Sequence, residues 1–100
     1  MKHRYIIIDG VLNSTGIRDE FEGYIKPQEL NLPNEFIIAL KNWLTKYEKT
    51  YYLTEGEIVP NMINELDNEG INLAKELKNY LGDEYKIKYH SDALQKTYLI

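Results

Sequence analysis

The sequence has no cysteine, only three prolines and six glycines among 100 residues, and no long hydrophobic run. The lack of cysteine excludes a disulfide framework, a thiolate nucleophile and a cysteine zinc site. No stretch reaches the roughly 18 apolar residues that a transmembrane helix needs. The apolar run before Asp9 is also too short for a signal peptide. We therefore expect a soluble, cytoplasmic protein that needs no metal or other cofactor to fold.

The proline and glycine residues stand singly, so nothing in the chain is typical of a linker between domains. One hundred residues suit a single domain, which at this size buries roughly 60–70% of the surface of its unfolded chain. With 43% hydrophobic residues, the chain can supply a core of its own. We expect residues 1–100 to form one domain.

Positive charge is missing from a long central segment. No lysine or arginine lies between Thr50 and Ala74, and the chain as a whole has a net charge of −4. Such an acidic segment repels phosphate backbones and disfavours nucleic-acid binding. It suits a basic protein partner, whose encounter rate it would raise. The alternative is a solvated surface that serves solubility alone.

Tyrosine is abundant, with nine residues, and is typical of binding surfaces because it joins an apolar ring to a polar tip. Tyr51 and Tyr52 are adjacent, so their side chains point in different directions. Aromatic anchors beside carboxylates predict an interface for a basic protein. The predicted partner-binding residues are Tyr51, Tyr52, Glu55, Glu57, Glu65, Asp67 and Glu69. The last three are expected on the solvent face of a helix.

The pattern of apolar residues predicts strands at both ends of the chain. Residues 5–8 form a β-branched and aromatic run, and residues 21–25 alternate weakly as a short second strand. Residues 85–90 alternate with one apolar face, and residues 96–100 read as a final strand. The short connection between these last two predicts an antiparallel hairpin.

Two helices are predicted between these strands. The first covers residues 33–49, opened by Pro33, and the second follows a plausible N-cap at Asn61. Gly70 falls on the apolar stripe of the second helix, where it would allow the backbone of another element to approach closely. Gly82 is expected to end this helix as a left-handed cap.

Together these elements have the order β(β)ααββ. The sequence therefore predicts the α+β class and a two-layer sandwich. Its sheet would have three or four strands, mixed or antiparallel, with both helices on one face.

Catalytic and metal-binding alternatives are weaker. Asp9 ends the first apolar run, and a small enzyme could use it with His90 or a nearby glutamate at the sheet edge, but a plain Asp-Gly bend is favoured. Glu65, Asp67 and Glu69 lack the spacing of a calcium loop. A third alternative is a homodimer joined through the edge of residues 98–100. We expect a non-enzymatic binding protein, either a monomer or a homodimer.

Residues 68–78 belong to the predicted second helix and contain a Glu-Gly pair and a Leu-Ala pair. Residues 81–89 follow with a Leu-Gly pair and an aromatic strand. This pattern, with the Leu32-Pro33 helix opening and Trp43, resembles small bacterial immunity proteins of polymorphic toxin systems, including contact-dependent growth inhibition. The resemblance covers about half of the chain. It implies a single cytoplasmic domain that binds and blocks one toxin domain, often a basic nuclease, and it assigns no functional residue by position.

Overall fold

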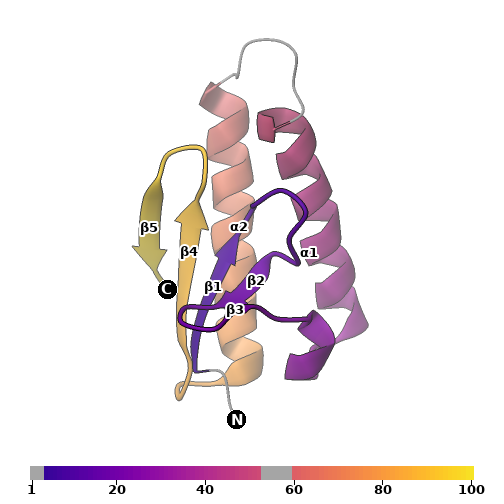
Figure 1. Ribbon diagram of the computed structural model, residues 1–100, viewed down its shortest axis with the longest axis vertical. Helices are drawn as coiled ribbons and strands as arrows, with labels where there is room; N and C mark the ends of the chain where they lie inside the picture. The colour runs from indigo at the N-terminus through magenta and orange to yellow at the C-terminus, as the bar shows by residue number, and fades with distance from the viewer. Residues whose placement is uncertain (1–3, 53–59) are drawn as a thin grey trace.

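In the computed structural model, which describes residues 4–52 and 60–100, a five-stranded sheet packs on two long helices (Figure 1). The elements follow the order strands, helices, strands. They are β1 (Tyr5–Asp9), β2 (Ile17–Asp19), β3 (Gly23–Tyr24), the 3-10 turn η1 (Pro27–Leu30), α1 (Asn34–Tyr47), the π-helical turn η2 (Glu48–Tyr52), α2 (Pro60–Leu81), β4 (Lys86–Ser91) and β5 (Lys96–Leu99).

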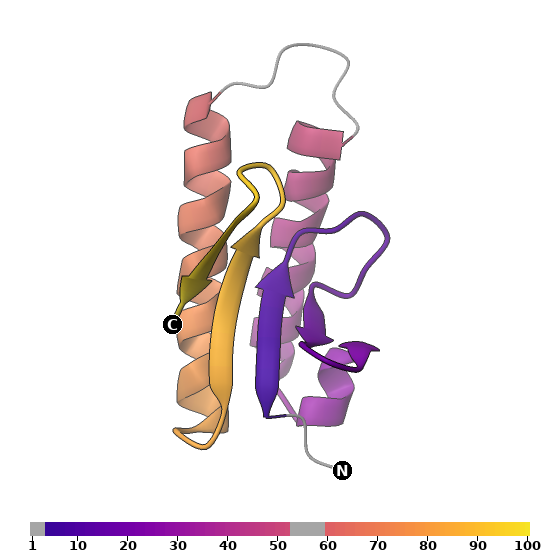
Figure 2. The same ribbon diagram turned by 60° about the vertical axis from the view of Figure 1, so that its left-hand side comes forward.

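The sheet has the strand order β3-β2-β1-β4-β5. β1 runs parallel to β4, and every other described pair is antiparallel. A parallel pair needs a crossover connection, and here both helices lie within it (Figure 2). The predicted α+β class and the predicted hairpin of β4 and β5 are confirmed. β5 forms one edge of the sheet, and its Leu99 is 82% exposed.

The predicted number of strands is wrong. After β1 the sequence predicts one strand before the helices, over residues 21–25, whereas the structure has two short ones, β2 and β3. Asp19 Oδ1 accepts hydrogen bonds from the backbone N–H groups of Phe21 at 2.8 Å and Glu22 at 3.1 Å. A carboxylate that binds the backbone two and three residues ahead favours a turn over a strand. Phe21 therefore lies in the turn, exposed, and the chain pairs on either side of it as β2 and β3.

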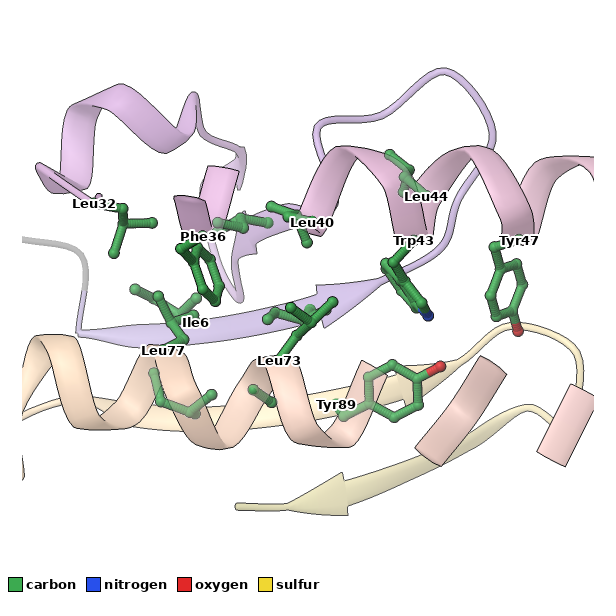
Figure 3. Close-up of a cluster of buried hydrophobic side chains, with 14 of the residues drawn as sticks. Ile6, Leu32, Phe36, Leu40, Trp43, Leu44, Tyr47, Leu73, Leu77 and Tyr89 are labelled. Carbon is green, nitrogen blue, oxygen red and sulfur yellow. The ribbon is translucent and has the colours of Figure 1, made fainter. Parts of the chain in front are cut away.

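The core lies between the sheet and the two helices (Figure 3). α1 contributes Phe36, Leu40 and Trp43, and they meet Leu73 from α2 and Tyr89 from β4. The Trp43 indole N–H donates to the Leu66 carbonyl at 2.8 Å, so the one polar atom of this ring is satisfied inside the core. This contact fixes the spacing of the two helices.

The helix ends differ from the sequence prediction in two places. α1 ends at Tyr47 and continues as η2, whose wider turn carries Tyr51 and Tyr52 beside Tyr47. Asn61 lies inside α2 instead of capping it, since the described helix already includes Pro60. The predicted cap at Gly82 is confirmed: its φ is +93°, and its N–H donates to the Lys78 carbonyl at 2.8 Å.

Gly70 does lie on the buried face of α2, but aromatic rings, not another backbone, occupy the space beside it. A Cβ atom there would lie 2.7 Å from Tyr89 Cζ and 2.9 Å from Trp43 Cζ2. Carbon atoms at ordinary contact are about 3.5–4.0 Å apart. The glycine therefore lets α2 press directly on these two rings.

Candidate functional site

β1 and β4 end side by side, with Asp9 in register with His90. Ligand sites in sheets with parallel strands form beyond the carboxyl ends of those strands. A shallow hollow of about 580 Å³ lies at this place. We call it the carboxyl-end hollow, and its lining residues are Asp9, Val11, Arg18, Tyr24, Tyr51, Tyr52, His90, Asp92 and Gln95.

Asp9 is the floor of the hollow, with only 1% of its surface exposed. Arg18 Nε from β2 donates to its Oδ2 at 2.6 Å, and the Tyr24 hydroxyl from β3 donates to its Oδ1 at 3.0 Å. A buried carboxylate needs such partners to remain charged. Asp9 is thus the last residue of β1 and the centre of a polar cluster. The sequence had favoured a plain Asp-Gly bend at this position.

Asp92 is the second buried carboxylate of the hollow and lies in the turn between β4 and β5. Its Oδ2 accepts a hydrogen bond from the Tyr52 hydroxyl. Its Oδ1 is 3.7 Å from His90 Nε2, beyond hydrogen-bond length. The other ring nitrogen of His90 bonds Thr97 Oγ1 at 2.8 Å. Among the described residues, the Asp92 carboxylate therefore accepts a side-chain hydrogen bond at Oδ2 alone.

Behind the hollow, Asp67 of α2 reaches into the core, so the expectation that it lies on the solvent face is wrong. It is 5% exposed and accepts hydrogen bonds from the Tyr89 hydroxyl at 2.6 Å and the Ser91 hydroxyl at 2.8 Å. The Tyr47 hydroxyl accepts the Ala93 N–H at 2.9 Å, and Figure 3 shows it directed at the β4–β5 turn. These bonds fix the turn that carries Asp92.

The other predicted partner-binding residues fall into separate places. Tyr51 and Tyr52 line the hollow, whereas Glu65 and Glu69 line a second groove, of about 660 Å³, with side chains of α1. There Glu69 pairs with Lys46 of α1 at 2.7 Å, so part of the acidic charge is balanced. Glu55 and Glu57 lie outside the described residues.

Sequence reasoning missed Arg18, Tyr24 and Asp92 as parts of one site. The only local signal was the acidic residue at the end of an apolar run, Asp9.

Burial raises the pKa of four tyrosines, Tyr24, Tyr47, Tyr52 and Tyr89, and nearby carboxylates raise it further. A folded tyrosine with a raised pKa keeps its proton above pH 10, where the unfolded chain loses it. The unfolded state then binds fewer protons, so the stability is complete below about pH 10 and falls as the pH rises above it.

In an alkaline titration, we therefore expect the native protein to show tyrosinate absorbance at 295 nm from fewer than its nine tyrosines. The remaining signal should appear together with the loss of circular dichroism on unfolding. The same protein in denaturant is the control, in which all tyrosines should ionise near pH 10. A native protein whose tyrosines all ionise in one such step would contradict the hydrogen bonds described above.

None of the described helices is long and apolar enough to cross a membrane. Within the described part of the chain, no group of three or more histidine or acidic side chains is placed to hold a metal ion.

No curated protein gave a significant match to the sequence. A family model described as Serratia CdiI immunity protein-like does match residues 14–92, from the segment before β2 to the turn that holds Asp92. Since this match spans more than half of the sequence, the chain belongs to the Serratia CdiI immunity protein-like family.

Proposed function

We propose that the chain is a non-enzymatic immunity protein that binds a toxin domain in the cytoplasm and blocks it. The family match over residues 14–92 carries this proposal. The geometry supports binding over catalysis, because Asp9 is already held by Arg18 and Tyr24 and His90 makes its described hydrogen bond to Thr97. A general base must reach the proton that it abstracts from a substrate, and both oxygens of Asp9 already accept hydrogen bonds from Arg18 and Tyr24.

The binding surface we propose surrounds the end of the molecule where α1 passes into η2. Tyr51 and Tyr52 are partly buried, and their rings meet edge-on at 4.8 Å, so they form a rigid aromatic anchor. Rigid aromatic side chains carry much of the energy of protein interfaces. Glu65 and Glu69 join the proposed surface from the second groove, which is also lined by Lys49 and Thr50 of η2. Glu55 and Glu57 belong to the proposal on sequence grounds. Asp67 supports the surface from within.

The net charge of −4 favours a basic partner, such as a nuclease domain, and disfavours nucleic acid or an anionic membrane. The immunity protein would cover the active site of the toxin sterically and hold it by charge. Such an interface would bury about 1,200–2,000 Å² in total. A chain of 100 residues can supply half of that area.

Growth rescue tests the function. We expect co-expression with toxin domains of contact-dependent growth inhibition systems to reveal at least one whose growth arrest this chain relieves. Because the mechanism is binding, rescue should require at least one immunity protein per toxin and should coincide with a 1:1 complex. Rescue at far lower amounts would contradict blocking by binding and would favour an enzyme.

Charge reversal tests the surface. In the variant Glu65→Lys/Glu69→Lys, the association rate for that toxin should fall about tenfold or more at low salt and less at high salt. The control is Asp83→Lys/Glu84→Lys, which changes the net charge equally on exposed residues of the turn after α2. If both variants slow association equally, the effect comes from overall charge and the proposed surface is wrong.

A further inference from the structure

We propose that the carboxyl-end hollow binds a cationic side chain, an arginine or a lysine, that the protein partner presents. The inference rests on the proposed function, since the immunity interaction supplies the partner. It goes further by assigning a chemical group to a particular site. Three features of the hollow lead to it: the acceptors around Asp92, the charge of Asp92 and the aromatic walls.

The hydrogen-bonding capacity around Asp92 is that of an acceptor, whereas the N–H donors of Arg18 lie at Asp9, which its Nε binds. A tyrosine hydroxyl has one proton to donate. Tyr24 donates it to Asp9, and Tyr52 donates it to Asp92, so both hydroxyls offer only lone pairs to a ligand. The side-chain amide of Gln95 donates one N–H to the backbone carbonyl of Asp92 at 2.6 Å. A group with several N–H donors complements the acceptors beside Asp92.

The charge of the hollow points the same way. Arg18 offsets Asp9 through their ion pair, and this leaves Asp92 as the excess charge when His90 is neutral. Among the described residues, Asp92 has no cation within hydrogen-bond distance, since His90 Nε2 is 3.7 Å away. Asp92 is nevertheless only 7% exposed, and a carboxylate in such a place gains from a charged partner.

The aromatic walls and the size suit the same ligand. Tyr51 and Tyr52 of η2 border the hollow together with Tyr24 of β3. Cations bind the faces of aromatic rings, and arginine does so most often. A volume of about 580 Å³ is enough for one long side chain with the segment that carries it.

The site is built before the partner arrives. Ser91 is held by Asp67, and Ala93 is held by Tyr47, so the turn on either side of Asp92 is anchored to both helices. A preformed site avoids the cost of ordering its groups during binding. This favours specific recognition of one side chain over general attraction to positive charge.

The test uses the full-length protein and a short capped peptide, acetyl-Gly-Arg-Gly-amide, in an NMR titration. We expect saturable shifts centred on the amides of Tyr52, His90 and Asp92. The matched peptide with citrulline, which has the shape of arginine without its charge, should bind at least tenfold more weakly. Equal binding of the two peptides, or shifts centred elsewhere, would overturn the inference.

The variant Asp92→Asn should reduce arginine-peptide binding at least tenfold, whereas Asp83→Asn, on an exposed turn, should not change it. The NMR spectrum of each variant shows whether the fold is intact, and Asp92→Ser serves as a second variant. Toxin binding separates the two proposals. A toxin that binds wild type and Asp92→Asn equally would overturn this inference and leave the immunity function standing, whereas failure of all toxins to bind would count against the function itself.

Discussion

Asp67→Ala is expected to lower the free energy of unfolding by about 3–5 kcal/mol, because it removes the acceptor of two buried hydroxyl groups, each worth roughly 1–3 kcal/mol when left unpaired. Tyr89 and Ser91 both donate to Asp67, and Ser91 is fully buried. The variant no longer buries a carboxylate, so it regains the free energy that this burial costs. The expected loss is therefore smaller than the sum of the two upper limits for unpaired hydroxyl groups.

The measurement is urea unfolding followed by circular dichroism, with the slope compared between variants to ensure that the change is in stability. Asp67→Asn keeps one acceptor oxygen in nearly the same shape, so it should lose only about 1–2 kcal/mol. Glu69→Ala is the matched control on the same helix: it breaks an exposed ion pair with Lys46 and should change the stability by about 0.5 kcal/mol or less.

The result would also decide the role of Asp67. A stable Asp67→Ala variant with lost toxin binding would make Asp67 a contact residue, as the sequence first indicated. A destabilised variant makes it a structural residue that orients the turn before Asp92. The same experiment therefore shows whether Asp67 contacts the toxin, as proposed for Glu65 and Glu69, or acts only inside the fold.

The error at Asp67 has a physical cause that the sequence already contained. Asp67 lies four residues after Ile63 and three before Gly70, and both are buried, so helical spacing places it on the same face. Its charge suggested solvent, since aspartate is rarely buried without partners. The partners, Tyr89 and Ser91, come from β4, so the sequence pattern of α2 does not predict them.

Local signals were sufficient for the helices and the hairpin, since spacing, Pro33 and Gly82 act within a few residues of the elements they define. The site depends on pairing across the chain. Asp9 and His90 are 81 positions apart and become neighbours only through the parallel register of β1 and β4. A hydrophobic pattern does not determine which strands pair, so the hollow could not be assembled from the sequence.

Gly70→Ala is expected to destabilise the protein, although helix preference alone predicts the opposite. Alanine in place of a glycine inside a helix gains about 1 kcal/mol. The new Cβ would lie 2.7 Å from Tyr89 Cζ and 2.9 Å from Trp43 Cζ2, both in the packed core. Overpacking costs about 3 kcal/mol at the upper end of its usual range, so we expect a net loss of about 2 kcal/mol.

Urea unfolding of two further variants identifies the cause. Asn64→Ala, on the exposed face of α2, reports helix preference alone and should gain about 0.5 kcal/mol. If the Tyr89 ring is what the new methyl group meets, Gly70→Ala should cost less in a Tyr89→Leu background, with a coupling of about 1 kcal/mol or more. Additive losses would show that Tyr89 is not the obstacle, and a stabilised Gly70→Ala would show that α2 can move away from the sheet. In either case the close contact of α2 with Tyr89, the residue that also binds Asp67, would not limit the position of the helix.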